Sequence, residues 1–375
     1  MTRPKILVTG ASGKTGSQVA AQLLTAGYPV RALVRREDER SARLQSGGAE
    51  IVVADLFDPE QLLSSMRGVQ RAYFLPPFDP YMIQSAAAFT VAAREAKLES
   101  VVGLSQWLSN PAHPALATRQ HWLADGLLTM LTNTAVTILN PGFFADMPYM
   151  SLMKYAAQLG VFPVPARGSS RNAPPSVDDI ARVAVASLMD PAKHDGKRYR
   201  PTGPVMLSLE EMAQIIGRVL GRKVRHVNMP MWMFYKAARK DGFDPFLMSV
   251  MGSYLRDHDR GAFESGGPTD DVFRVTGRQP ETFETITRRY ASRPEAMRTA
   301  GNFMRVLAGF MSVPMRPGFD PDRYNRALSV PQPAKPTLSA DSALWRQEHG
   351  LPSANERSTS ESSGRAATRS IAPAA

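Results

Sequence analysis

At 375 residues, with 43% hydrophobic and 21% charged residues, the chain is long enough for about two domains and has an ordinary globular composition. It has no cysteine, which excludes disulfides, thiolate nucleophiles and cysteine metal sites. The formal net charge of +11 comes mostly from arginines spread along the chain, without the basic runs interleaved with aromatics that are typical of nucleic-acid binding. We therefore expect a solvated basic surface and no direct nucleic-acid partner.

The start of the chain and its apolar runs bear on the cellular compartment. The first predicted strand begins at residue 6, which leaves no room for a signal peptide before it. The nearest candidate for a membrane segment, residues 303–315, is too short and carries Arg305. These features predict a cytoplasmic protein with no membrane partner.

Strands and helices alternate through the first 140 residues. Short apolar runs predict buried strands, and the segments between them have helical periodicity. The predicted strands are residues 6–8, 29–36, 50–55, 69–75, 100–105 and 135–139, and the predicted helices are 19–24, 40–44, 59–66, 81–96 and 116–131. This alternation predicts an α/β fold with a doubly wound parallel sheet, the Rossmann arrangement.

After Gly142 the alternation is lost, and segments rich in Phe, Met and Pro predict a smaller α+β lobe on the substrate side. Amphipathic patterns predict helices there, and Ser208 with Glu211 three residues later forms a capping box. The predicted helices are 177–189, 208–220, 231–240 and about 281–290. The predicted units are 1–145 (Rossmann domain), 146–291 (smaller lobe, from which the chain can return to the sheet), 292–351 (helical extension) and 352–375 (disordered tail).

The first predicted strand runs directly into a glycine-rich turn of the form G-x-x-G-x-x-G, which opens a helix. That context indicates a dinucleotide-binding βαβ unit, with a tight turn that binds no ligand as the alternative. Gly10 permits the sharp turn, Gly13 lets the backbone approach a pyrophosphate, and Gly16 lets the helix pack closely on the strand. The residues expected at the pyrophosphate are Gly10, Ser12, Gly13, Lys14, Thr15 and Gly16.

The end of the second strand bears on which dinucleotide is bound. NAD sites usually place an acidic residue there, which accepts hydrogen bonds from the ribose 2′-hydroxyl. This chain has Arg35 and Arg36 instead, with no carboxylate before Glu37. A guanidinium suits the 2′-phosphate of NADP, and a solvent-exposed arginine pair is the alternative interpretation. We therefore expect NADP as the cofactor, with NAD as the second choice.

Further cofactor contacts are expected where the other strands end, because ligands bind outside the carboxyl ends of the strands in such sheets. Asp55 and Leu56 end the third strand, where an adenine would lie. A rigid Leu-Pro-Pro loop ends the fourth strand, beside the phosphates and the nicotinamide ribose. The remaining expected contacts are Leu75, Pro76, Pro77, Ser105, Pro141 and Phe143.

The catalytic candidates lie at the end of the fifth strand and in the helix that follows it. A short-chain dehydrogenase would place Tyr-x-x-x-Lys there, whose phenol donates a proton, but no tyrosine in this chain has a lysine four residues later. His121 and Asp125 lie four residues apart on one helix face. His121 is expected either to hydrogen-bond substrate or the nicotinamide ribose and to titrate near neutrality, or to form a partly buried pair with Asp125. The catalytic candidates are His121, Ser105 and Asp125, and no metal site is expected because no two-histidine metal spacing occurs.

Together these motifs resemble the NmrA-like family of atypical short-chain dehydrogenase/reductases over residues 1 to about 291. The resemblance implies a Rossmann domain with bound NAD(P) and a smaller lobe over the nicotinamide. Members of this family include quinone and azo-dye reductases, and also regulators that bind the dinucleotide without turnover. His121 stands where a lysine would precede the acidic residue by four positions, and Asn140 replaces an arginine often seen before Pro-Gly. The matching residues are 8–16, Arg35, 54–56, Ser105, 137–144, 177–184, 202–204, 220–222 and 270–280.

Two hypotheses from different classes follow. The first is an NAD(P)H-dependent oxidoreductase that hands hydride to a quinone-like or other electron-poor small molecule, an acceptor that needs little proton donation. Its apolar pocket wall is expected to consist of Phe143, Phe144, Met147, Tyr149 and Met150. The second is a non-catalytic, NADP(H)-binding redox sensor whose C-terminal lobe or tail contacts a partner protein. A homodimer is compatible with either hypothesis.

Overall fold

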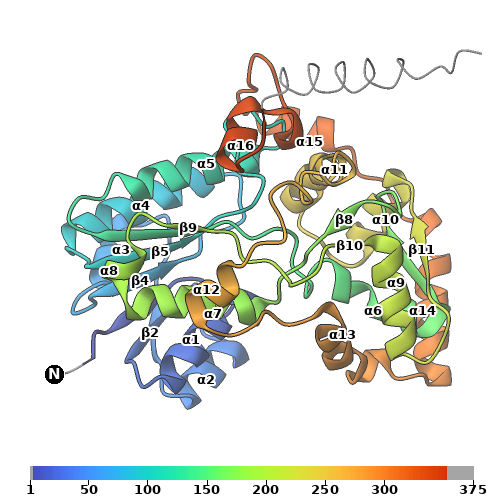
Figure 1. Ribbon diagram of the computed structural model, residues 1–375, viewed down its shortest axis with the longest axis horizontal. Coiled ribbons are helices and arrows are strands. Elements are labelled where there is room, and N and C mark those ends of the chain that lie inside the picture. Colours follow the sequence, from blue (N-terminus) through green and yellow to red (C-terminus); the bar gives the residue numbers. More distant parts are fainter. Residues whose placement is uncertain (1–2, 353–375) are drawn as a thin grey trace, which may run out of the picture.

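The computed structural model describes residues 3–352 and has a seven-stranded sheet at its centre (Figure 1). The strands of this sheet are β1 (Ile6–Val8), β2 (Val30–Val34), β3 (Glu50–Val53), β4 (Arg71–Phe74), β5 (Ser100–Leu104), β6 (Ala135–Leu139) and β9 (Arg198–Tyr199). They are all parallel, in the order β3-β2-β1-β4-β5-β6-β9. The predicted doubly wound α/β sheet is therefore confirmed.

Helices cover both faces of the sheet. They are α1 (Lys14–Thr25), α2 (Glu39–Ser46), α3 (Pro59–Ser65), α4 (Met82–Glu95), α5 (Leu116–Thr129), α7 (Val177–Met189) and α12 (Asp271–Thr276). Apolar residues of α1, α2, α7 and α12 form one core with the sheet, and those of α3, α4 and α5 form another. Alternate residues of one strand divide between the two faces, so Ile6 and Val8 point to the first core and Leu7 to the second.

After β6 the chain leaves the sheet, returns through α7 and β9, and leaves again to complete a second lobe (Figure 1). The further elements up to residue 291 are α6 (Met153–Leu159), β7 (Val161–Val164), β8 (Arg171–Asn172), α8 (Pro191–His194), β10 (Leu207–Ser208), α9 (Leu209–Val219), β11 (Arg225–Asn228), α10 (Met231–Lys240), α11 (Pro245–Asp259) and α13 (Phe283–Ala291). Two small sheets form in this lobe, β8 with β10 antiparallel and β7 with β11 parallel. The second lobe has its own hydrophobic core, which also takes in residues that follow β5 and β6.

Three helices follow the second lobe: α14 (Ala300–Met311), α15 (Pro321–Ala327) and α16 (Ala343–Glu348). Helix α14 packs on α6, and α15 packs on α11. Trp345 of α16 is fully buried, and its Nε1 donates to the carbonyl oxygen of Trp107 over 2.8 Å. The last helix therefore docks on the loop that follows β5. Of the predicted disordered tail, residues 353–375 lie outside the described part of the chain.

Local sequence signals explain several helix ends. The predicted capping box is confirmed at α9, where Ser208 Oγ accepts from Glu211 N over 3.1 Å and Glu211 Oε2 accepts from Ser208 N over 2.7 Å. Helix α11 is absent from the sequence-based prediction, although Asp244 caps it and Pro245 occupies its first position. Between residues 3 and 352, no helix combines the length and the apolar character needed to cross a membrane.

Candidate active site

The glycine-rich turn between β1 and α1 is tightly folded. Gly10 has a φ of +58°, and a Cβ there would lie 2.8 Å from Leu75 Cδ2. A Cβ at Gly16 would overlap the carbonyl oxygen of Gly10, whereas a Cβ at Gly13 would meet only that oxygen, at 3.0 Å. Gly10 and Gly16 are therefore needed by the turn itself, and Gly13 keeps open the space in front of the helix.

The first turn of α1 presents backbone N–H groups that no other part of the protein satisfies. Its N-cap is Gly13, which has no side chain to cap the helix. Within residues 3–352, the N–H groups of Ser12, Lys14 and Thr15 donate no hydrogen bond. Such groups, at the positive end of a helix dipole, bind anions. This end of α1 is therefore suited to the diphosphate of a dinucleotide.

Cations lie beside this helix end. Lys14 Nζ lies 3.3 Å from Met147 Sδ at the start of the second lobe. Burial lowers the pKa of Lys14, the nearby carboxylate of Asp146 opposes this effect, and the Arg293 guanidinium adds to it. Lys14 thus brings a cation to this helix end, which favours an anionic ligand, and Asp146 and Arg293 lie near enough to act on its charge.

Arg35 and Arg36 follow β2 at the same edge of the sheet. Both are exposed, and neither takes part in a hydrogen bond or ion pair with any residue from 3 to 352. Arg31 of the same strand, in contrast, lies 2.8 Å from Glu50 Oε1 and donates to the carbonyl oxygen of Ser65 over 2.7 Å. Arg31 therefore serves the fold, while the two guanidinium groups at the strand end are open to a ligand.

The loops that follow β3 and β4 reach this edge as well. Asp55 is exposed, and its Oδ1 accepts from Phe57 N over 3.0 Å, which closes a turn. Leu56 is buried in the core. Thr9 Oγ1 accepts from Leu75 N over 2.8 Å, which holds the Leu-Pro-Pro loop next to the end of β1. The expected adenine and ribose contacts thus lie at the carboxyl edge, and their role in cofactor binding stays a prediction.

Ser105, Asp125 and Asn140 form a buried polar cluster, which the more exposed Arg198 contacts from its edge. Asp125 Oδ2 accepts from Ser105 Oγ over 2.9 Å, from Arg198 Nη1 over 2.9 Å and from Asn140 Nδ2 over 3.4 Å. Burial raises the pKa of Asp125, and the Arg198 cation and these hydrogen bonds oppose the rise. Arg198, from β9, thus brings a guanidinium next to Asn140, the position at which the resemblance leads us to expect arginine.

Both sequence-based descriptions of His121 need correction. The pairing with Asp125 is wrong, because the His121 side chain forms no hydrogen bond within residues 3–352 and its Nδ1 is buried without a partner. Titration near neutrality is also wrong, because burial lowers the pKa of His121 from the ordinary 6.5 to about 4. The imidazole is therefore neutral at physiological pH. Hydrogen bonding to a ligand stays a prediction for this residue.

Other buried polar atoms without hydrogen-bond partners among the described residues include Gln106 Nε2, Thr118 Oγ1 and the hydroxyl of Tyr254. Gln106 comes soon after β5, and Thr118 lies one turn before His121 on α5. Tyr254 comes from α11 of the second lobe, and both Thr118 and Gln106 are close enough to lower its pKa against the larger, raising effect of burial. Buried polar groups in proteins are nearly always hydrogen-bonded, so four without partners indicate a site for a polar ligand group or for water.

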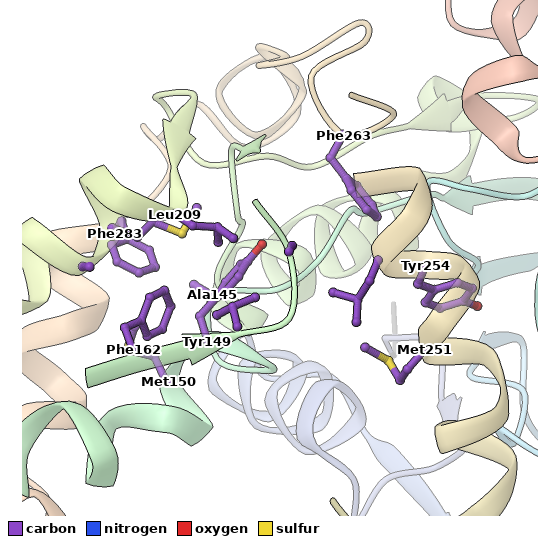
Figure 2. Packing of buried hydrophobic residues seen from close by; sticks show 14 of the residues in the cluster. Ala145, Tyr149, Met150, Phe162, Leu209, Met251, Tyr254, Phe263 and Phe283 are labelled. Carbon is purple, nitrogen blue, oxygen red and sulfur yellow. The ribbon is translucent and has the colours of Figure 1, made fainter. Parts of the chain in front are cut away.

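Apolar and aromatic side chains form the core of the second lobe, and Tyr254 and Phe263 are among them (Figure 2). Phe143, which follows β6, stacks on Phe263 with ring centroids 4.6 Å apart, and its ring lies 6.2 Å from that of Tyr254. The predicted pocket wall is wrong for Tyr149 and Met150, which are buried in the core of the second lobe. These two side chains fill the core because the segment that carries them turns directly into α6, which packs in that lobe.

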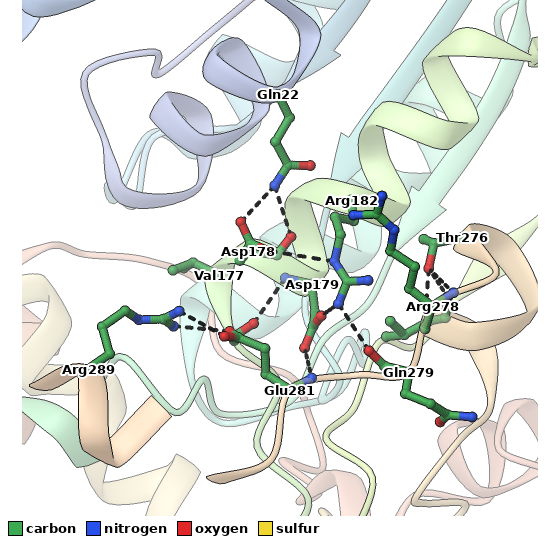
Figure 3. Close-up of polar contacts among 12 residues, drawn as sticks. Gln22, Val177, Asp178, Asp179, Arg182, Thr276, Arg278, Gln279, Glu281 and Arg289 are labelled. Atoms are coloured by element: carbon green, nitrogen blue, oxygen red, sulfur yellow. Dashed lines mark hydrogen bonds and ion pairs between the residues drawn. The ribbon is translucent and has the colours of Figure 1, made fainter. Parts of the chain in front are cut away.

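Polar contacts fasten the second lobe to the helix that carries the glycine turn (Figure 3). Gln22 of α1 donates to Asp178 Oδ1 of α7 over 2.9 Å. Arg182 of α7 lies 3.5 Å from Asp178 and also pairs with Asp179. The carboxylate of Asp179 in turn accepts from the backbone N–H of Glu281 over 2.8 Å. The segment that leads into α13 is thus held, through α7, against α1.

Known proteins with similar sequences include oxidoreductases. Residues 2–122 match the model of the NmrA-like family. The chain is 30% identical over 293 residues to the NAD(P)H azoreductase of Xenophilus azovorans, which covers 76% of this chain and 98% of that protein. It is also 25% identical over 268 residues to quinone oxidoreductase 2 of Escherichia coli, which covers 71% of this chain and 90% of that protein.

Two solved structures show the same fold. An NADPH-dependent quinone oxidoreductase of Escherichia coli, complexed with NADPH, matches with a TM-score of 0.63 at 23% identity, over 75% of this chain and 98% of that one. The triphenylmethane reductase of Citrobacter sp., complexed with NADP(H), matches with a TM-score of 0.65 at 24% identity, over 76% of this chain and 99% of that one. In both cases about a quarter of the present chain lies outside the match.

Proposed function

The chain belongs to the NmrA-like family, and on this premise we propose that it is an NAD(P)H-dependent oxidoreductase that reduces a quinone-like or other electron-poor small molecule. One observation supports the proposal: the uncapped amino end of α1 follows β1, while Gln106, Thr118 and His121 follow β5, and parallel strands end at a common carboxyl edge. The helix end suits a diphosphate, and these polar side chains suit the polar group of an acceptor. When bound, NAD(P)H supplies a hydride from its nicotinamide ring.

We infer that the preferred cofactor is NADPH. The N–H groups of Ser12, Lys14 and Thr15 would hold the diphosphate. Arg35 and Arg36 are the open cations where the ribose end of the dinucleotide is expected, and they would bind a 2′-phosphate through charge-assisted hydrogen bonds. The residues at this position would give NADH no equivalent interaction.

The acceptor is inferred from the chemistry around Phe143. The azoreductase and the quinone oxidoreductase that resemble this chain are named for azo compounds and quinones, which are flat and electron-poor. Phe143, which is only partly buried, offers an aromatic ring for such a molecule, and His121 and Thr118 offer hydrogen-bonding atoms that are otherwise unused. An acceptor of this kind can take a hydride without a strong acid in the site.

One observation favours a second function, a non-catalytic NADP(H) sensor. The hydroxyl of Ser105 is engaged by Asp125, and the imidazole of His121 does not titrate near neutrality. Neither residue is thus placed as a proton donor, and a protein that only binds the dinucleotide needs none.

Acceptor-dependent oxidation of NADPH separates the two functions. Wild-type protein should oxidise NADPH with simple quinones or an azo dye, and Gly13→Val, which fills the space in front of α1, should abolish both binding and oxidation. Binding of NADPH is measured in parallel by fluorescence titration. Tight binding of NADPH without oxidation by any acceptor would favour the sensor.

A further inference from the structure

We propose that Tyr254, from the second lobe, donates a hydrogen bond to the acceptor oxygen of a quinone-like substrate. This role, which rests on the proposed function, supplies a phenol that α5 lacks, because no tyrosine of the chain has a lysine four residues later. Ser105 Oγ donates to Asp125 over 2.9 Å and is not free for this purpose. The hydroxyl of Tyr254, in contrast, makes no hydrogen bond of regular geometry among residues 3–352, although Thr118 and Gln106 lie close enough to lower its pKa.

The position of Tyr254 fits such a contact. Its side chain comes from α11 but lies where β5 and β6 end, since its ring centroid is 6.2 Å from that of Phe143 and 6.2 Å from that of His113. Thr118 and Gln106, whose side chains also have a buried atom without a partner, are its polar neighbours. Tyr254 is 7% exposed, so a ligand that meets its hydroxyl is largely shielded from water.

A buried hydrogen bond fixes α11 over this place. His113 Nδ1 accepts from Ala115 N over 3.0 Å, so the ring proton lies on Nε2, which donates to Asp257 Oδ2 over 2.7 Å. Asp257 lies three residues after Tyr254, on the same side of α11. The second oxygen of Asp257 accepts from Ala340 N over 2.9 Å, so the chain beyond the second lobe also braces the helix. The phenol is therefore held in place before any ligand arrives.

To donate a hydrogen bond to a quinone oxygen, the hydroxyl of Tyr254 must stay protonated. Burial raises the pKa of Tyr254 to about 12, so the O–H group stays intact at neutral pH. Reduction of a quinone to a hydroquinone takes one hydride, which converts NAD(P)H to NAD(P)+, and one proton, which comes from water. Negative charge develops on a quinone oxygen as the hydride arrives, and a fixed O–H donor in a shielded site stabilises that charge.

Two other buried tyrosines of this lobe, Tyr149 and Tyr290, have hydrogen-bonded hydroxyls. The hydroxyl of Tyr149 accepts from Asn172 Nδ2 over 3.3 Å, and that of Tyr290 donates to Asp146 Oδ1 over 2.9 Å. A tyrosine that served only to pack α11 would gain nothing from an unsatisfied hydroxyl, because a phenylalanine would fill the same space without that loss.

The test is Tyr254→Phe, which removes the hydroxyl and keeps the ring against Phe143. Tyr235→Phe is the matched control, because Tyr235 is also buried and a Cβ at Gly252 of α11 would lie 2.9 Å from its hydroxyl. Two acceptors are compared, a quinone and a cationic triarylmethane dye. The dye takes the hydride at carbon and becomes neutral, so it needs no hydrogen bond at an oxygen. The Kd of the quinone for the enzyme saturated with NADP+ is measured independently of turnover.

Tyr254→Phe should lower kcat/KM for the quinone by about ten- to a hundred-fold and raise the Kd of the quinone, with kcat/KM for the dye and the Kd of NADPH unchanged. Tyr235→Phe should alter none of these quantities. Equal losses for quinone and dye, or no loss for either, would overturn the role of Tyr254. If wild-type protein reduces neither acceptor, the proposed function is wrong, but the Kd of the quinone still tests the contact with Tyr254. A wild-type protein that does not bind the quinone, or an unchanged Kd in Tyr254→Phe, overturns that contact.

Discussion

Arg198 Nη1 donates to Asp125 Oδ2 over 2.9 Å and so joins β9, the last strand of the sheet, to α5. Asp125 is buried, and its carboxylate has one cationic partner among the described residues. Asn140, which stands at the position of the expected arginine, adds a weaker hydrogen bond of 3.4 Å. Arg198 of β9 therefore supplies the positive charge next to Asp125 that Asn140, the residue before Pro141, does not supply.

Arg198→Met should lower the free energy of unfolding by about 1–3 kcal/mol, because it leaves a buried carboxylate without its cation, while the 41% exposure of the Arg198 side chain softens the effect. Burial already raises the pKa of Asp125, and loss of the cation raises it further. The ionised form is then penalised in the folded state, so the loss of stability should be larger at pH 7 than at pH 4.5. Urea unfolding at both values measures this.

Arg43→Met is the control for Arg198→Met. Arg43 lies 3.8 Å from Glu39 and both side chains are largely exposed, so its removal should change the free energy of unfolding by less than about 0.5 kcal/mol. Equal changes in the free energy of unfolding for the two substitutions would show that the contact between Arg198 and Asp125 stabilises the fold no more than an exposed ion pair does.

Buried histidines should make the protein acid-sensitive. Burial lowers the pKa of His121 and of His258 to about 4, and that of His349 to about 3, from the ordinary 6.5. Between pH 6.5 and about 4 the unfolded chain therefore binds more protons than the folded protein, so stability is complete above pH 6.5 and is lost as the pH falls. His121→Gln should reduce this loss, as measured by urea unfolding from pH 7.5 to 4.5.

The lowered pKa of His121 also predicts how activity depends on pH. Because His121 is neutral from pH 6 to 8, the profile of kcat/KM against pH should show no step near 6.5 that His121→Gln removes. A step of that kind would mean that His121 is far more accessible to water than its burial indicates.

Substitutions of two glycines of the turn, Gly13 and Gly16, should have different effects on dinucleotide binding and on stability. Gly13→Val should abolish dinucleotide binding with a loss of stability of about 1 kcal/mol or less, because its Cβ meets only the Gly10 carbonyl oxygen at 3.0 Å. Gly16→Val should destabilise the protein strongly, since its Cβ overlaps the backbone of Gly10. NADPH titration combined with thermal unfolding distinguishes the variants. A folded Gly13→Val protein that binds NADPH within a few-fold of wild type contradicts the placement of the diphosphate.

Arg35 is expected to make the protein prefer NADPH over NADH. Arg35→Ala should weaken NADPH binding about ten- to a hundred-fold, as expected for the loss of a charge-assisted contact, and leave NADH binding unchanged. Arg36 can share the phosphate, so the double variant is titrated as well. Arg40→Ala is the control, because Arg40 is exposed nearby but lies 2.7 Å from Asp38. Equal losses for NADH and NADPH would mean that the arginines at this strand end support the fold instead.

The sheet could be predicted because its signals are local. Short apolar runs for the strands, period-3.6 patterns for the helices and the glycine spacing are all readable within about ten residues. Strand β9 was not predicted, because a two-residue strand, Arg198–Tyr199, has no period. Helix α11 was not predicted either, since Phe246, Met248, Val250 and Met251 bury several of its sides and leave little amphipathic contrast. The Asp-Pro start at residue 244 was the usable signal.

The site was predicted less completely than the fold. The glycine turn and the arginines after β2 belong to one continuous motif, so their spacing indicated a ligand class. The environment of His121 depends on burial by the second lobe, which no local pattern contains, and this is why its titration was predicted wrongly. The approach of Tyr254 to Thr118 depends on how α11 packs across the cleft, which only the tertiary structure reveals.

The most direct test of the proposed oxidoreductase is a single turnover without oxygen. A limiting amount of NADPH, fully bound by an excess of protein, is mixed with a quinone, and the loss of NADPH absorbance is followed together with the formation of hydroquinone. We predict that one hydroquinone forms for each NADPH consumed, and that Gly13→Val protein forms none. Protein-bound NADPH that stays reduced while the quinone persists would contradict the account.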